Sequence, residues 1–265
     1  PALNTVKKDV AAKSFAVNTN LYTAEISTIN GGSITSLILH NYALNDSESV
    51  NLIDNNNVNN LLVGFRSTDG DNVFLTDGWV SDNDFDINVY TNQATVTFHK
   101  TINDKQIAKS LTFYPDKHII DISIDASSIQ RWVSQGVLTL SWLGGLPLTE
   151  PNKKDEQIYY QAMLYQGDET YAPKAKPHTQ AKLERMDYPT DWVAIRTKYF
   201  ISALVPEDQS PGCGGTRLAT TVRVSRSIDR NLYRFVSSSI VGWPGAVGLL
   251  ASALAKVSRP PNLGA

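Results

Sequence analysis

Alternation with a period of two is the feature that most constrains the fold of this chain. Apolar and polar side chains alternate in the runs Tyr22–Ser27, Ala94–His99 and Ile120–Asp125. Such alternation places one row of side chains on a core and the other row in water, as in antiparallel strands with one solvated face. No stretch before residue 210 shows a convincing helical stripe. We therefore predict one all-β domain over residues 11–207, built as an extended antiparallel sandwich of two packed sheets.

Residues that favour turns separate these runs. They are Asn30-Gly31-Gly32, Thr68-Asp69-Gly70-Asp71, Asn103-Asp104, Pro115-Asp116 and Gly144-Gly145. These residue types tolerate positive φ or bond their own backbone, so they end one strand and begin the next. Two longer stretches, 41–60 and 151–188, are polar or rich in proline, and we expect them to be surface loops that line a groove or contact a partner.

Charge divides the chain into two parts. Residues 1–210 hold 17 Lys/Arg against 25 Asp/Glu, whereas residues 211–265 hold 7 against 1. The change falls at the Pro/Gly cluster Pro211–Gly215, which is typical of a boundary. We therefore treat residues 1–10 as an N-terminal lead and residues 208–265 as a basic tail of irregular or partly helical structure. An acidic main domain also disfavours nucleic acid as a partner.

The tail contains one stretch long enough to cross a bilayer. Phe235–Ala255 has 21 residues without a formally charged side chain, which is close to the length of a spanning helix. Pro244, three glycines and four serines disfavour that helix,. The arginines before it offer a second interpretation, a basic helical face that touches anionic lipid; they are Arg223, Arg226, Arg230 and Arg234. A tail without function is the third. The opening residues Pro1–Ser14 lack a secretory signal,, so we expect the chain to be a fragment.

Metal chemistry has few candidate ligands in this sequence. Four histidines and the single Cys213 exclude a disulfide framework and a Cys-rich zinc site,. Acidic residues gather between positions 69 and 86, where they could supply oxygen ligands to calcium; they are Asp69, Asp71, Asp77, Asp82, Asp84 and Asp86. The calcium-binding EF-hand pattern fails, because Ile87 and Gln93 stand where it needs Gly and Glu,. We interpret these acids as the solvated face of strands and turns, and predict no metal site.

Acid and base catalysis would need a histidine and a glutamate in one pocket. The candidates for a sugar mutarotase are His99, His118 and His178 with Glu150, but none has the apolar sequence context that perturbs a pKa,. We therefore predict no catalytic residue, no cofactor and no enzymatic activity. A binding module for glycans or peptides is the other alternative, through an exposed sheet edge or through aromatic side chains. The aromatic candidates are Trp142, Tyr159, Tyr160, Tyr165 and Trp192, of which we assign Trp142 and Trp192 to the core,.

Five segments together resemble one known family. They are Asp191–Pro206 (DWVAIRTKYFISALVP), Phe15–Tyr42, Lys109–Ile124 (KSLTFYPDKHIIDISI), Trp142 with Gly144-Gly145-Leu146, and Tyr165-Gln166-Gly167. In their order along the chain, these segments resemble the large periplasmic domain of YidC-type membrane protein insertases. The resemblance covers about residues 11–207. Within Asp191–Pro206, Lys198 and Tyr199 are candidates for a functional site. The alternative is that Val193, Ile195, Tyr199 and Ile201 pack in a final pair of strands, and we favour it.

The resemblance implies a β-supersandwich, similar to the domains of sugar mutarotases, on the periplasmic face of the bacterial inner membrane. It implies a noncatalytic role in the insertion and folding of inner-membrane proteins, with the Sec translocon and nascent membrane proteins as partners. The family's membrane core of five helices is absent from these residues, so no residue of its groove can be carried over. Which residues bind partners stays unknown at this point.

Overall fold

The computed structural model describes residues 10–45, 48–53, 60–142, 146–166, 169–172, 182–186, 192–206, 219–226, 233–234, 238–241 and 247–252. Within these ranges the chain is built mainly of β-strands in antiparallel sheets, which confirms the all-β prediction. The helical elements in these ranges are short: the 3-10 turns η1 (Ile29–Gly31) and η2 (Ser127–Trp132), and the α-helix α1 (Lys153–Tyr159). No helix in the described ranges is long and apolar enough to cross a membrane.

A five-stranded sheet has the order β4-β3-β2-β1-β8. Its strands are β1 (Ser14–Thr19), β2 (Tyr22–Ser27), β3 (Ser33–Asn45), β4 (Glu48–Asn51) and β8 (Ile87–Val89). Neighbours are antiparallel except that β8 runs parallel to β1. The sheet thus contains the predicted opening hairpin, with Gly31 and Gly32 at φ of 66° and 98° in the turn between β2 and β3.

A nine-stranded sheet has the order β14-β13-β16-β17-β21-β11-β10-β9-β7. Its strands are β7 (Val80–Ser81), β9 (Ala94–Ile102), β10 (Lys105–Phe113), β11 (Ile119–Asp125), β13 (Gln161–Gln166), β14 (Glu169–Tyr171), β16 (Trp192–Arg196), β17 (Ile201–Pro206) and β21 (Val247–Ser252). Asn103 and Asp104 join β9 to β10 with φ of 46° and 58°, as the turn chemistry predicts.

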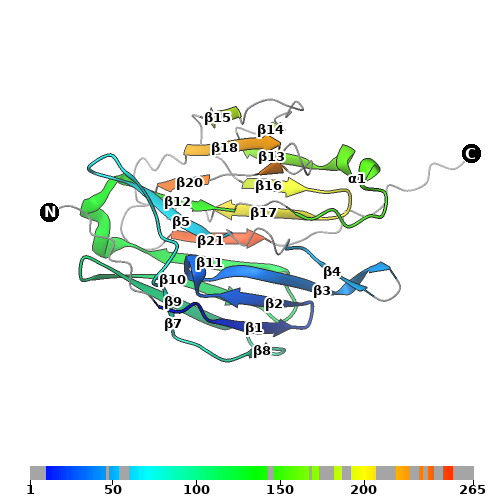
Figure 1. Cartoon of the computed structure of the whole chain (residues 1–265), viewed down its shortest axis with the longest axis horizontal. Coiled ribbons are helices and arrows are strands. Elements are labelled where there is room, and N and C mark those ends of the chain that lie inside the picture. The colour runs from blue at the N-terminus through cyan, green and yellow to red at the C-terminus, as the bar shows by residue number, and fades with distance from the viewer. Residues whose placement is uncertain are drawn as a thin grey trace, which may run out of the picture.

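A seven-stranded sheet contains the path β15-β18-β20-β12-β5-β6, and β19 pairs with β18. Its strands are β5 (Leu62–Ser67), β6 (Asn72–Phe74), β12 (Val133–Ser141), β15 (Lys182–Met186), β18 (Ala219–Arg226), β19 (Tyr233–Arg234) and β20 (Ser238–Val241). Figure 1 shows β9–β11 with β1–β3 in the lower half of the molecule and β12, β13, β16 and β17 in the upper half.

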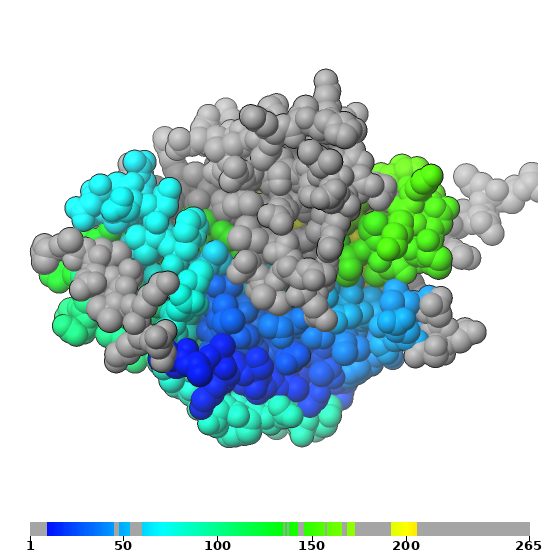
Figure 2. Space-filling model, in the orientation of Figure 1, coloured from blue at the N-terminus to red at the C-terminus, as the bar shows by residue number. Residues whose placement is uncertain are grey.

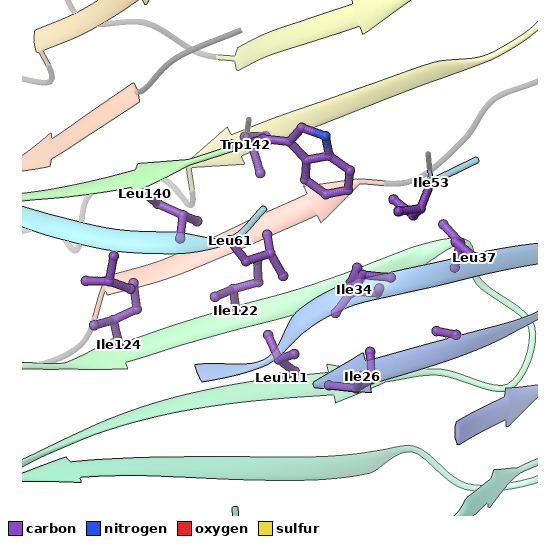
Figure 3. Packing of buried hydrophobic residues seen from close by; sticks show 14 of the residues in the cluster. Ile26, Ile34, Leu37, Ile53, Leu61, Leu111, Ile122, Ile124, Leu140 and Trp142 are labelled. Carbon is purple, nitrogen blue, oxygen red and sulfur yellow. The ribbon is translucent and has the colours of Figure 1, made fainter. Parts of the chain in front are cut away.

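One hydrophobic core runs between the sheets. Phe15 on β1 stacks on Phe98 on β9 at a centroid separation of 6.4 Å, so the five-stranded sheet packs on the nine-stranded one. In Figure 3, Ile26 and Ile34 face Leu111, while Leu61, Leu140 and Trp142 extend the same core toward the seven-stranded sheet. The alternation in the sequence therefore places its apolar row on this core.

Two stretches that the sequence predicts to be loops carry regular structure. In residues 41–60, β3 continues to Asn45 and β4 pairs back onto it. In residues 151–188, the chain forms α1, β13, β14 and β15. Both predictions of surface loops were wrong for these segments. Strand pairing is made by backbone groups and α1 is only seven residues long, so neither needs a long apolar pattern in the sequence.

The basic tail contributes strands to the sheets. Of residues 208–265, which we expected to be irregular or partly helical, the structure describes β18, β19, β20 and β21. Strand β21 lies between β11 and β17, and β20 pairs with β12 and β18. The remaining residues of Phe235–Ala255, like Cys213 and the N-terminal lead before residue 10, lie outside the described residues.

Candidate interaction surface

The candidate catalytic residues do not form one site. His99 on β9 points outward and its Nε2 lies 3.1 Å from a carboxylate oxygen of Asp82. His118 stacks on the ring of Tyr22, and burial lowers the pKa of the imidazole, so the expectation that no candidate histidine has a perturbed pKa was wrong for this residue. Glu150 is partly buried beside α1, where its backbone N–H donates to Glu156. His178 lies outside the described residues. Each described candidate therefore has a separate local role.

Three of the acids proposed as calcium ligands bond to neighbours of their own. Asp82 pairs with His99, Asp84 lies 3.2 Å from the Lys13 ammonium, and Asp86 accepts a hydrogen bond from the Ala16 backbone N–H. In the described part of the chain, no group of three or more His, Cys, Asp or Glu is placed to hold a metal ion. This arrangement fits acids on a solvated face.

The aromatic candidates divide into a buried group and a half-buried group. Trp142 is buried in the core, as predicted (Figure 3), and the hydroxyl of the buried Tyr160 accepts a hydrogen bond from the Leu146 N–H. Trp192 is only half-buried, so its assignment to the core was wrong in part. It stacks on Tyr165 of the neighbouring strand, with centroids 5.8 Å apart and planes within 7°.

The segment Asp191–Pro206 forms the hairpin of β16 and β17 from Trp192 onward. Val193 and Ile195 are buried and Tyr199 packs against the core, as predicted. The turn is closed by Thr197, whose N–H donates to the Phe200 carbonyl (2.8 Å) and whose hydroxyl oxygen accepts from the Phe200 N–H (3.2 Å). This turn holds the Lys198 side chain at the edge of the hairpin, beside α1.

Lys198 joins the hairpin to α1. Its Nζ lies 2.5 Å from Oδ2 of Asp155, and 5.7 Å and 5.3 Å from the ring centroids of Tyr159 and Tyr199. The hydrogen bond to Asp155, followed by that to Tyr199, raises the pKa of the lysine above its usual value. Lys198 is therefore a fixed positive charge that orients the helix, and it has no feature of a nucleophile or base.

A second acid, Glu156, holds α1 to the segment that precedes it. Glu156 is fully buried and accepts hydrogen bonds from the Thr149 hydroxyl (3.2 Å) and the Glu150 N–H (2.8 Å). The sequence carries a signal for this helix that our prediction missed. Asn152 accepts from the Asp155 N–H at 3.3 Å, as an N-cap does, and two acids follow in the first turn,.

The exposed residues of α1 form a small surface of mixed character. Ile158 is 79% exposed, the highest value among the large hydrophobic residues that the structure describes, and Tyr159 is 39% exposed. Lys153 and Lys154 are exposed beside them. We name these four residues the α1 surface. Figure 2 shows the segment that contains them at the right-hand side of the molecule.

Comparison with known sequences finds one family that the chain resembles over most of its length. The sequence model of the YidC periplasmic domain matches residues 14–227. Membrane protein insertase YidC of Prosthecochloris aestuarii is 28% identical over 217 residues, which cover 80% of this chain and 37% of the relative. Those of Chlorobium luteolum and Chlorobaculum parvum are each 26% identical, over 74% of this chain and 34% of the relative.

The chain therefore spans about a third of the length of these relatives. The family match extends through all the strands from β1 to β18, and so includes the hairpin of β16 and β17, α1 and the stacked pair Tyr165–Trp192. On the extent of this match, the chain belongs to the YidC periplasmic domain family.

Proposed function

We propose that this chain is the noncatalytic periplasmic domain of a YidC-like insertase, and that it assists the insertion and folding of inner-membrane proteins by docking or positioning partners. The single observation that carries the proposal is the family match over residues 14–227. The partners proposed are subunits of the Sec translocon and nascent membrane proteins. The location proposed is the periplasmic face of the bacterial inner membrane.

The side chains support a positioning role. The candidate catalytic residues lie at separate places, each in contact with a different neighbour. By contrast, α1 is held to the body of the domain by the Asp155–Lys198 ion pair and by the buried Glu156, while its outer residues face the solvent. An element that is held in place at two points and has exposed side chains is compatible with a docking surface.

Crosslinking in cells tests the proposed function. The chain is joined to a native YidC membrane core, and photoreactive residues are placed at exposed positions such as Ile158 and Phe85. We expect crosslinks to translocon subunits or to nascent membrane proteins from at least one of these surfaces. The buried Leu111 provides the control position, which should give none. The absence of a crosslink to any envelope protein would overturn the proposal.

A glycan- or peptide-binding module is the second candidate, favoured by the stacked pair Tyr165–Trp192. The neighbouring Leu164 and Val193 point to the core, so the alternation of the strands turns Tyr165 and Trp192 to the opposite face,. Aromatic rings that are half-exposed on a sheet stack on sugars or anchor apolar side chains. A glycan array and peptide titrations followed by tryptophan fluorescence test this candidate. Trp192→Phe should abolish the signal, and no binding in any titration would remove the candidate.

A further inference from the structure

The helix α1 buries one of its acidic residues, pairs the other, partly exposed one with a lysine, and leaves its two lysines and its isoleucine exposed. Asp155 is neutralised by Lys198 at 2.5 Å, and Glu156 is fully buried. Lys153, Lys154 and Ile158 are left exposed. A seven-residue helix with two lysines and two acids thus presents a basic and apolar outer side, although its own sequence has no net charge.

The side chains of the α1 surface match the chemistry of a bilayer interface. A tyrosine ring is stable at the level of the lipid headgroups, and lysine places its charge there while its stem covers apolar surface. An exposed isoleucine gains free energy when it enters the boundary between headgroups and acyl chains. Each lysine near an anionic leaflet strengthens binding by about fivefold.

The opposite charge lies elsewhere on the domain. Residues 67–99 contain six Asp and no Lys or Arg. This stretch includes β7 and β8, which Figure 1 shows at the bottom of the molecule, away from α1 at the right. Phe85, between β7 and β8, is 68% exposed, so it is about as accessible as Ile158 but has two acidic neighbours, Asp86 and Asp84, of which Asp84 is paired with Lys13. An anionic membrane would repel that region and attract the α1 surface.

We propose that the α1 surface rests on the anionic lipid headgroups of a bilayer, with Ile158 inserted, Tyr159 at headgroup level, and Lys153 and Lys154 against lipid phosphates. The Asp155–Lys198 pair and the buried Glu156 set the angle at which the helix meets the lipid. The proposal rests on the proposed function in one respect, that the domain lies beside a membrane. It fixes which side of the domain faces that membrane.

A fluorescent label on α1 tests the proposal in the full chain. With Cys213→Ser as the background, Ile158→Cys is labelled with an environment-sensitive fluorophore and mixed with vesicles of phosphatidylcholine containing phosphatidylglycerol. We expect a blue-shifted emission that is quenched by lipids with a nitroxide in the acyl chain. Phe85→Cys, labelled in the same way, is the matched control and should show neither change. The label also distinguishes binding through α1 from binding through the Arg-rich tail, because vesicles bound by the tail alone would leave the emission of the label unchanged.

Two further measurements decide the role of charge and folding. The double variant Lys153→Gln with Lys154→Gln should bind the anionic vesicles about 25-fold more weakly, from about fivefold for each lysine. The affinity is read from the lipid concentration at which the emission of the label shifts. Vesicles of phosphatidylcholine alone should give a similarly weak response, and circular dichroism checks that each variant is folded. A chain that binds anionic vesicles with no change at position 158 would overturn the proposal. A crosslink from position 158 to a protein, without any contact of the label with lipid, would also overturn the proposal, because it would assign the α1 surface to a protein partner.

The vesicle assay does not depend on insertase activity. If the label enters the bilayer while crosslinks to envelope proteins are absent, the docking function fails and the membrane contact stands. If crosslinks form from Phe85 and the label stays in water, the membrane contact fails and the docking function stands. The two proposals can therefore be rejected separately.

Discussion

Lys109 shows how much one residue can hold together in this domain. Its Nζ donates to the carbonyl oxygens of Asn30 (3.0 Å) and Leu61 (2.6 Å), and its side chain is completely buried. Both acceptor residues have left-handed backbone, with φ of 57° and 53°. Lys109 thus joins β10 to the turn before β3 and to the entry of β5. Burial lowers the pKa of the amine to about 7.

The first prediction concerns the pH dependence of stability. The pKa of Lys109 is about 7 in the folded protein, against an ordinary value of 10.5. Between these values the unfolded chain binds a proton that the folded protein lacks, so the free energy of unfolding should rise with pH, by up to about 1.4 kcal/mol per unit. Urea unfolding between about pH 7 and pH 9 measures the slope. This range stays below the pH at which tyrosines of the unfolded chain ionise.

The control for this slope is Lys109→Met, which removes the titrating group and keeps a long side chain. Lys100, whose pKa is also lowered by burial, is present in both proteins and cancels in the comparison. The variant is expected to be less stable, because two buried carbonyl groups lose their donor. What matters is its pH slope, and equal slopes in the two proteins would contradict the prediction.

The second prediction concerns Gly32, which lies where the core leaves no room for a side chain. A Cβ there would lie 2.7 Å from Cε2 of Phe98 and 2.8 Å from Cδ1 of Leu111, and φ is +98°. Gly32→Ala should lower the free energy of unfolding by about 2 to 4 kcal/mol, from overpacking and backbone strain together. Gly70→Ala is the matched control. Gly70 also has φ of +98°, but a Cβ there has only Arg66 Nη2, at 3.9 Å, within 4 Å.

Chemical denaturation of both variants separates the two causes. Gly70→Ala should cost only the strain of a left-handed alanine, about 1 kcal/mol. If both variants lose the same stability, the close packing at Gly32 is relieved by movement of Phe98 or Leu111, and the overpacking part of the prediction is wrong.

Single elements were predictable where a local pattern determines them. The alternation in Tyr22–Ser27, Ala94–His99 and Ile120–Asp125 corresponds to β2, β9 and β11. The same alternation on β10 also points Lys109 inward, because Ile107 and Leu111 on either side are buried. We did not draw that conclusion, since a charged residue in a core needs acceptors that come from distant segments. Helix α1 was not predicted because its seven residues are too few to show a recognisable helical period of apolar residues.

The third prediction concerns how α1 is attached. Glu156→Ala should lower the free energy of unfolding by about 2 to 3 kcal/mol, because the Thr149 hydroxyl and the Glu150 N–H would be left buried without an acceptor,. Asp155→Ala should cost less than about 1 kcal/mol, because its pair with Lys198 is partly exposed,. Urea unfolding of both variants provides the comparison. A larger loss for Asp155→Ala would mean that the ion pair, and not the buried acid, holds the helix.

At the scale of the whole molecule, the fold class could be predicted and the order of strands could not. Period-two alternation indicates sheets with one solvated face but carries no information on which strands are neighbours. The parallel pair β1 and β8 is separated by about 70 residues, and β21 comes from the tail that we placed outside the domain. Candidate sites were no easier to locate, because α1 is held in place by contacts with Lys198, in the turn between β16 and β17, which is distant in the sequence.

The last prediction concerns the position of β21 in the nine-stranded sheet. This strand pairs with β11 on one side and β17 on the other, so it joins the two parts of the sheet. A chain that ends at residue 246 would expose the backbone edges of both neighbours. We expect faster amide hydrogen exchange in β11 and β17, while β9 and β10 stay protected by their own pairing,. Unchanged protection in β11 and β17 would show that these two strands do not need β21.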